Sequence, residues 1–108
     1  MYNPFSKGRW YRFVINSDGT NITITESDLA GVEIESLGGP VEVTQSLIKL
    51  PVGYKALSVV SDINFHDSSI SATTFGVLGA DSEGKQNCVI PPAAMFSYME
   101  LYIFAKKG

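Results

Sequence analysis

The residues with the clearest potential for chemistry lie around a single histidine. His66 is the only histidine of the chain, and Asp62 and Asp67 are close enough in sequence to orient its ring. A hydrolase with a serine nucleophile would need this histidine as its general base. The sequence contains no Gly-x-Ser-x-Gly turn that would expose such a nucleophile. Because a lone histidine in a polar turn is typical of a surface residue, the sequence predicts no catalytic residue and no enzyme.

The same segment alternates oxygen-bearing side chains. Asp62, Asn64, Asp67 and Ser68 could supply ligands to a hard cation such as calcium. Calcium usually takes about six to eight oxygen ligands. The segment lacks the spaced carboxylates and the late glutamate of a dedicated calcium loop. A polar loop held by local side-chain hydrogen bonds is therefore the better interpretation, and no metal or cofactor is expected.

Other polar motifs are equally incomplete. Glu33, Glu35 and Glu42 could form a carboxylate pair that cleaves a glycosidic bond, but that mechanism depends on a separation that the sequence does not give. Solvated acidic side chains explain these residues more simply. Gly38-Gly39-Pro40 indicates a turn, because no Lys-Ser/Thr pair and helix follow it as in a phosphate loop.

Aromatic residues gather in the first and last strand-like segments. Their faces can pack in a core, stack on a sugar ring, or anchor a contact between subunits. Arginine beside tyrosine favours the subunit contact, since both are enriched at protein interfaces. The aromatic residues concerned are Trp10, Tyr11, Phe13, Tyr98, Tyr102 and Phe104. The predicted interface consists of Arg9, Trp10, Arg12, Tyr98, Tyr102 and Phe104.

The last strand-like segment, Phe96 to Ala105, is apolar on both faces. One face carries Met99, Leu101 and Ile103 with two small residues, and the other is mainly aromatic. The segment from Asn21 to Thr25 shows the usual alternation of isoleucine with polar residues. A strand with two apolar faces needs a second covering layer, most simply another subunit. We therefore expect the first and last strands to lie together and to face a partner.

Short strands separated by turns dominate the rest of the sequence. Asp18-Gly19 is typical of a tight hairpin turn, and no period of 3.6 residues is long enough to indicate a substantial helix. The spacing predicts one all-β domain over residues 1–108, an antiparallel β-sandwich or jelly-roll-like domain of about eight to ten short strands. The predicted strands are 9–15, 21–25, 32–36, 41–44, 47–50, 55–65, 70–78, 86–90 and 96–105.

Composition narrows the classes of function. The chain has 108 residues and a formal net charge of −3, so a general nucleic-acid binder is not expected. No apolar stretch approaches the length of a membrane span, and the N-terminal residues do not resemble a secretory signal. We expect a product made in the host cytoplasm without a signal peptide, with no membrane partner. Cys88 is the only cysteine and is expected to be a small buried side chain.

Charge is distributed unevenly along the chain. Basic residues stand near both ends, whereas the first half holds a long acidic stretch without lysine or arginine. Solvated loops explain this pattern most simply, and complementary contacts between neighbouring copies are the functional alternative. The basic residues are Lys7, Arg9, Arg12, Lys106 and Lys107, and the acidic ones are Asp18, Glu26, Asp28, Glu33, Glu35 and Glu42.

These features together resemble the small all-β structural proteins of tailed-bacteriophage particles, of the capsid-decoration or tail and fibre knob type. The resemblance is carried by Arg9 to Ile15, the turn-rich middle and Phe96 to Ala105, and it transfers no site residue. It implies a virion component that forms a homo-oligomer, a trimer or ring, and binds other virion proteins. The alternative is a β-sandwich module that binds a surface saccharide or a receptor through exposed aromatic side chains.

Overall fold

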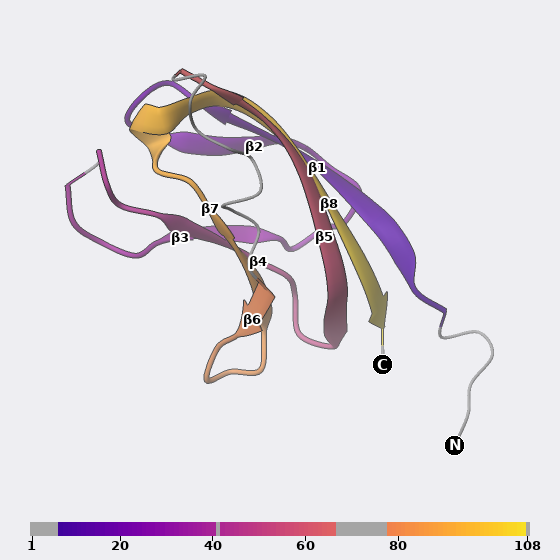
Figure 1. The fold of residues 1–108 in the computed structure, drawn as a ribbon. Helices are drawn as coiled ribbons and strands as arrows, with labels where there is room; N and C mark the ends of the chain where they lie inside the picture. Colours follow the sequence, from indigo (N-terminus) through magenta and orange to yellow (C-terminus); the bar gives the residue numbers. More distant parts are fainter. Residues whose placement is uncertain (1–6, 41, 67–77, 108) are drawn as a thin grey trace.

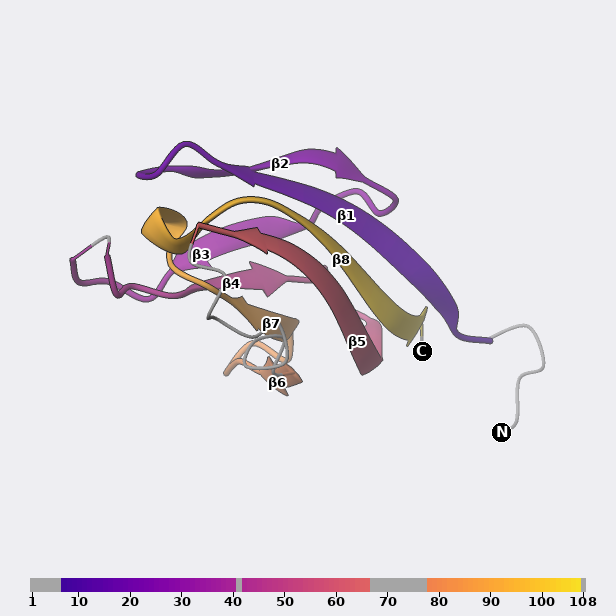
Figure 2. The same cartoon turned by 45° about the horizontal axis from the view of Figure 1, so that its top comes forward.

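The computed structural model describes residues 7–40, 42–66 and 78–107, which form two antiparallel sheets packed face to face (Figure 1). Eight strands are present within these residues. The first sheet has the order β2-β1-β8-β5 and the second has the order β3-β4-β7-β6. Figure 2 shows the two sheets as separate layers. The prediction of an all-β sandwich is therefore confirmed.

The strands of the first sheet are long, and those of the second are short. A 3₁₀ turn, Ala93–Met95, leads from β7 into β8. The bounds of the first sheet are β1 Arg9–Ser17, β2 Ile22–Ser27, β5 Tyr54–Phe65 and β8 Phe96–Lys107. Those of the second are β3 Glu33–Ser36, β4 Ser46–Lys49, β6 Leu78–Ala80 and β7 Gln86–Ile90.

The β1–β2 turn forms where the sequence places Asp18-Gly19. The Asp18 carboxylate accepts hydrogen bonds from the backbone N–H groups of Thr20 and Asn21, at 2.9 and 2.7 Å. Gly19 has a φ of 96°, a left-handed conformation that glycine adopts without strain. Local side-chain chemistry thus fixes the hairpin that brings β2 beside β1.

The core lies between the sheets and is made by alternate residues of the paired strands. In β8, Met99, Leu101, Ile103 and Ala105 are buried, and their neighbours in sequence point to the other side. The remaining buried members of the core cluster are Tyr11, Phe13, Ile15, Ile48, Leu50, Cys88, Ile90 and Phe96. One face of each end strand therefore belongs to the ordinary sandwich core.

Cys88 lies in this core, as predicted. It is fully buried on β7, and burial raises the pKa of its thiol to about 12. A protonated, inaccessible thiol is a poor nucleophile and a poor metal ligand. Cys88 therefore serves as a small core side chain.

The strand predicted over residues 41–44 is wrong for the residues described. Residues 42–44 belong to a turn, in which the Pro40 carbonyl accepts hydrogen bonds from the N–H groups of Val43 and Thr44. These turn hydrogen bonds take the place of strand pairing. The predicted strand 70–78 lies outside the described residues except at Leu78, where β6 begins. β6 continues for two residues beyond the end of that predicted strand.

No helix among the described residues is long and apolar enough to cross a membrane.

Candidate functional site

The outer face of the β2-β1-β8-β5 sheet gathers most of the predicted interface residues. We use "outer face" for the side that points away from the second sheet. β1 pairs with β8 so that Trp10 is opposite Phe104, Arg12 opposite Tyr102, and Asn16 opposite Tyr98. Because side chains alternate along a strand, all of these residues lie on the same side of the sheet. The first and last strands therefore pair, as predicted.

One half of the outer face is apolar. We define the apolar patch as Trp10, Val60, Tyr102 and Phe104. Trp10 and Phe104 are in ring contact, with centroids 5.3 Å apart, and Val60 of β5 is opposite Tyr102 in register. Trp10, Val60 and Tyr102 line a shallow hollow of about 240 Å³. Trp10 is 46% exposed and Val60 is 55% exposed, so large apolar side chains face solvent in the middle of the sheet.

A glycine covers one edge of the apolar patch. Gly8 precedes β1 and lies against the ring of Phe104, where an added Cβ would come within 2.6 Å of a ring carbon. This close approach explains why Phe104 is only partly exposed. The part of the patch open to a partner is therefore the Trp10 side and the Val60 side.

The other half of the outer face is polar and centres on Glu100. Its carboxylate accepts hydrogen bonds from the hydroxyls of Tyr98 and Tyr102, both at 2.7 Å. Arg12 donates to the same carboxylate at 3.1 Å and also lies 3.5 Å from Glu26 on β2. Two tyrosines of the final strand therefore hold a charged pair in place rather than only supplying apolar surface.

These contacts shift the titration of the groups involved. Hydrogen bonds from Tyr98, Tyr102 and Arg12 lower the pKa of Glu100 to about 2. The Tyr102 hydroxyl and the Glu100 carboxylate raise the pKa of Arg12, and the hydrogen bond to Glu100 raises the pKa of Tyr98. Each shift favours the protonation state in which the network is formed. The network is therefore intact at neutral pH.

We expect the Glu100 network to make the protein sensitive to acid in a defined window. The folded pKa of about 2 lies below the ordinary value of 4.5, so the stabilisation from Glu100 is complete above about pH 4.5. It is lost as the pH falls toward 2. Glu100→Gln should flatten the pH dependence of the unfolding midpoint in this window, as measured by urea titrations at closely spaced pH values.

Other charged groups around Glu100 define the controls for this experiment. Arg12, Glu26 and Asp62 are opposite it or next to its partners on β1, β2 and β5. Asp18 and Asp81 also have lowered pKa values, so some acid sensitivity should persist in the variant. Glu42→Gln changes an exposed carboxylate with no ion pair among the described residues. It should leave the dependence of the unfolding midpoint on pH unchanged. Parallel curves for wild type and Glu100→Gln would contradict the expectation.

A buried valine lies on the same outer side of β1. Val14 is opposite both Glu100 and Glu26, is only 3% exposed, and is not a member of the core cluster. The long stems of the neighbouring charged side chains can cover such a residue while their charged ends stay near solvent. The polar half of the outer face therefore covers Val14. In the apolar patch, by contrast, Trp10 and Val60 remain exposed.

Arg9 is the predicted interface residue that the structure separates from the others. It shares its side of β1 with Tyr11, and its guanidinium lies 4.6 Å from the centre of that ring. It therefore faces the opposite side of the sheet from Trp10. Arg12 is on the outer face as predicted, but its charge is already paired with Glu100 and Glu26.

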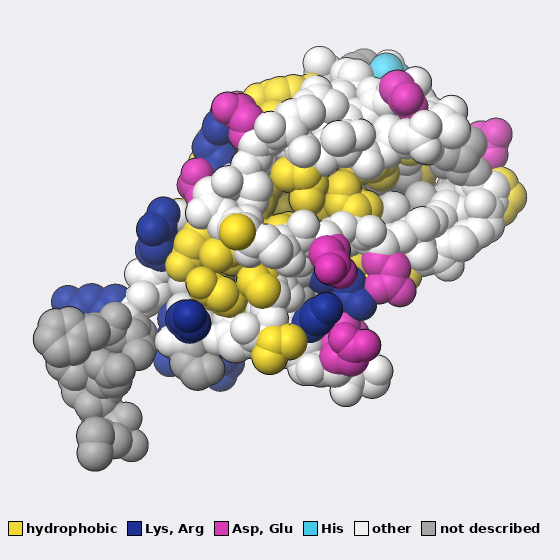
Figure 3. All heavy atoms as spheres, turned by 180° about the vertical axis from the view of Figure 1, so that it is seen from behind, with side chains coloured by type: hydrophobic (Ala, Val, Ile, Leu, Met, Phe, Trp, Pro, Cys, Tyr) yellow, Lys and Arg dark blue, Asp and Glu magenta, His cyan; other side chains and the backbone are white. Residues whose placement is uncertain are grey.

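The exposed basic residues gather at one end of the first sheet (Figure 3). Lys55 of β5 is opposite Lys106 of β8, and Arg9 is opposite Ala105. We define the basic end as Lys7, Arg9, Lys55, Lys106 and Lys107, and none of them forms an ion pair within the described part of the chain. Arg9 and Lys107 each lie over a tyrosine ring, but no carboxylate of the described residues neutralises the charges of this end.

Part of the acidic stretch is used within the protein. Glu35 of β3 lies 2.6 Å from the amino group of Lys49, which also lies 2.7 Å from Asp81. Asp28 accepts a hydrogen bond from the Arg12 backbone N–H at 2.9 Å. Glu42 remains exposed in the β3–β4 turn.

The histidine segment does not form a site among the described residues. Asp62 and Asn64 lie on β5 opposite Glu100 and Tyr98, and His66 is exposed just after the strand. Asp67 and Ser68, which complete the candidate cation loop, lie outside the described residues. Within the described ranges no three His, Cys, Asp or Glu side chains are placed to hold a metal ion.

Sequence reasoning missed Glu100 and Val60. The spacing Tyr98-x-Glu100-x-Tyr102 places a carboxylate between two hydroxyls on one face of a strand, and this signal was available in the sequence. Val60 gave no comparable signal, because its position on the outer face depends on the register of β5 against β8.

Comparison with protein-family models, curated proteins and solved structures found no match.

Proposed function

We propose that this protein is a structural assembly protein that binds further copies of itself through the outer face of the β2-β1-β8-β5 sheet. The observation that carries the proposal is the apolar patch, an exposed group of large side chains around a hollow on an otherwise polar face. Clustered apolar surface of this kind is typical of interaction sites rather than of isolated surface residues.

The layout of the face supports this proposal. Trp10 and Tyr102 belong to the residue types that most often dominate binding energy. The Glu100 network and Arg12 lie beside them and can form the hydrated border of an interface. The hollow beside Trp10 offers a place for an apolar side chain of a neighbouring copy.

Charge supports association between copies as well. The basic end has no ion partners among the described residues, whereas acidic side chains such as Glu42 are exposed elsewhere on the same chain. Contacts between unlike regions of neighbouring copies would set their orientation and speed their encounter. Association should therefore weaken as salt concentration rises.

The resemblance described above supports a particular setting for this assembly. We propose a virion of a tailed bacteriophage, where the protein acts as a decoration, tail or fibre component beside other virion proteins. An all-β sandwich without a catalytic role is compatible with that setting, and so is a symmetric homo-oligomer.

The mass of the protein in solution tests self-association directly. Sedimentation velocity over a wide range of concentrations should show an oligomer that dissociates on dilution. The fluorescence of Trp10, the sole tryptophan, should become less sensitive to acrylamide as the oligomer forms, because its exposed ring is covered. A monomer at every concentration would overturn the proposal.

A second candidate function uses the same apolar patch. An exposed tryptophan beside polar side chains can stack on a sugar ring, so a surface saccharide is an alternative occupant. Quenching or enhancement of Trp10 fluorescence by added saccharide, at concentrations where the protein is monomeric, would favour this alternative.

A further inference from the structure

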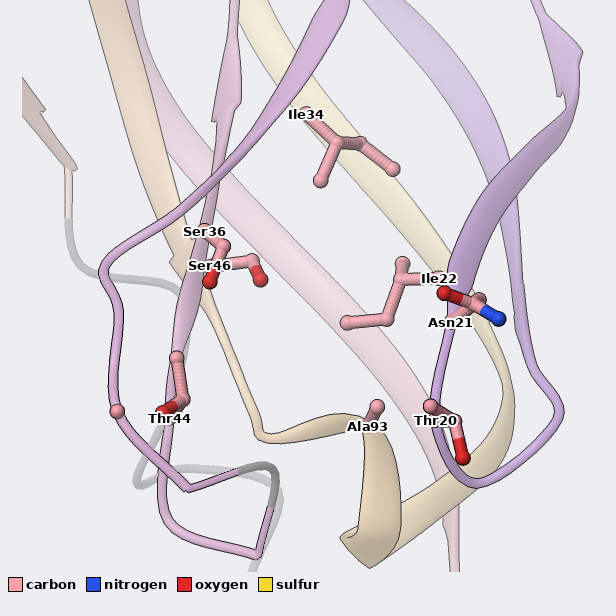
Figure 4. Close-up of a pocket in the computed structure, with 9 residues that line it drawn as sticks. Thr20, Asn21, Ile22, Ile34, Ser36, Thr44, Ser46 and Ala93 are labelled. Carbon is pink, nitrogen blue, oxygen red and sulfur yellow. The ribbon is translucent and has the colours of Figure 1, made fainter.

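A second hollow lies away from the outer face, between the edges of the two sheets. β2 ends the first sheet and β3 ends the second, and these strands do not pair with each other. Figure 3 shows hydrophobic side chains at the bottom of a hollow on this side of the molecule. The cleft has a volume of about 300 Å³. Ile22 and Ile34 project into it from the two edge strands (Figure 4).

The walls of this cleft are held in place by hydrogen bonds within the protein. Ser17 donates to the Ala93 carbonyl at 2.5 Å, which ties the 3₁₀ turn to β1. Asp18 fixes the turn that carries Thr20 and Asn21. On the opposite side, the Thr44 hydroxyl lies 2.8 Å from the Gly38 and Pro40 carbonyls. The cleft is therefore largely formed before any ligand arrives, as small-molecule sites usually are.

None of the described residues that line the cleft is charged. A charged ligand would have to leave water without gaining an opposite charge, which is unfavourable. A pure hydrocarbon ligand would leave the hydroxyl and amide groups of the walls without partners. The chemistry that suits both surfaces is a neutral ligand with an apolar face and several hydroxyl groups.

Ser46 gives the most specific indication. It is only 6% exposed, and its hydroxyl forms no hydrogen bond with the described residues, although it is not sealed from the cleft. Ser36 is opposite Ser46 in the β3–β4 register, and Figure 4 shows the two side chains together on one wall. The hydroxyl is therefore open to the cleft and is not used by the described residues. A ligand hydroxyl that enters the cleft would hydrogen-bond to it.

We propose that this cleft binds a neutral hexose unit, free or at the end of a glycan. The Ser46 and Ser36 hydroxyls would hydrogen-bond to the sugar hydroxyls, and Ile22 and Ile34 would contact the C–H face of the ring. The volume suits one small ring rather than a longer ligand buried along its length. This site is separate from the apolar patch and does not depend on self-association.

Nuclear magnetic resonance titration of the full chain tests this proposal. Glucose, galactose and mannose are the probes, and glucuronic acid controls for charge. At least one neutral sugar should shift the amide signals of Thr20, Asn21, Ser36 and Ser46, while glucuronic acid shifts them less. Shifts centred on Trp10 and Tyr102 would overturn the cleft as the site, as would no shift with any of the three sugars.

Two serine variants test the role of the Ser46 hydroxyl in this titration. Ser46→Ala removes a hydroxyl with no hydrogen-bond partner among the described residues, so the fold should be retained and the affinity for the sugar should fall about fivefold or more. Ser82→Ala makes the same change at an exposed turn residue remote from the cleft and should bind as wild type does. Equal affinity in the Ser46→Ala variant would overturn the assigned role of this hydroxyl. A protein that proves monomeric should give the same sugar titration. Failure of the proposed self-association can therefore be told apart from failure of the proposed sugar site.

Discussion

Val60→Lys is expected to dissociate the assembled protein while leaving the monomer folded. Val60 is 55% exposed and lines the hollow with Trp10 and Tyr102, so a lysine is tolerated in the monomer. In the oligomer its ammonium group would be buried against apolar side chains without a partner, which is strongly unfavourable. The dissociation constant measured by sedimentation should rise by about a hundredfold or more.

Val43→Lys is the matched control for this experiment. Val43 is 69% exposed in the β3–β4 turn, far in the structure from the apolar patch. The same substitution there changes net charge equally and should leave the dissociation constant near that of wild type. Equal weakening by both variants would mean that charge alone, rather than the apolar patch, governs assembly.

Tyr102→Asp gives a stronger but less specific disruption. It removes a side chain of the hollow, but it also removes the hydrogen bond to Glu100 and brings a second carboxylate close to it. We expect both dissociation and a lower unfolding midpoint. Val60→Lys therefore separates assembly from folding more cleanly, because Val60 makes no side-chain hydrogen bond.

Phe13→Ala is expected to cause the largest loss of stability. Phe13 is fully buried on the inner face of β1, opposite Leu101 of β8, in the central strand pair of the first sheet. Truncating such a side chain typically costs about 3–5 kcal/mol. Small domains have a total stability of about 5–15 kcal/mol, so the variant should be close to unfolding at 37 °C. Urea titration at low protein concentration measures the difference in the monomer.

Phe104→Ala makes the same chemical change on the outer face. Phe104 is only partly buried and contacts Trp10 and Gly8, so its loss should cost less than half as much stability as the loss of Phe13. Its effect should instead appear in association. Similar losses of stability in the two variants would show that the outer face is as important to the folded monomer as the core.

The parts of the fold that follow from neighbouring residues were predictable. Asp18-Gly19 forms its turn through contacts within four residues, and the alternation at Asn21 to Thr25 appears in β2 with isoleucine inward. The pairing of β1 with β8 was predicted from a pattern that the two segments share, because both carry apolar residues on both faces.

Two kinds of feature were not predictable. In one, turn hydrogen bonds compete with strand pairing, and in the other the contact joins segments that are far apart in the sequence. The sequence of residues 41–44 alternates as a strand would, but hydrogen bonds from Val43 and Thr44 to the Pro40 carbonyl favour a turn over residues 42–44. Arg12 was assigned to an interface from its type alone, and its pairing with Glu100 depends on strand register. The cleft could not be foreseen, because Ile22 and Ser46 approach it from different sheets.

The antiparallel pairing of β1 with β8 also constrains when the protein can fold. Arg12 and Glu100 are 88 residues apart in sequence but are joined across the centre of the first sheet. During synthesis, β1 can pair with β2 along one edge, but its other edge has no strand partner until β8 leaves the ribosome. Loop closure over such a distance slows folding. We therefore expect Phe13 and the apolar residues near it to stay exposed to aggregation until synthesis of β8 is complete.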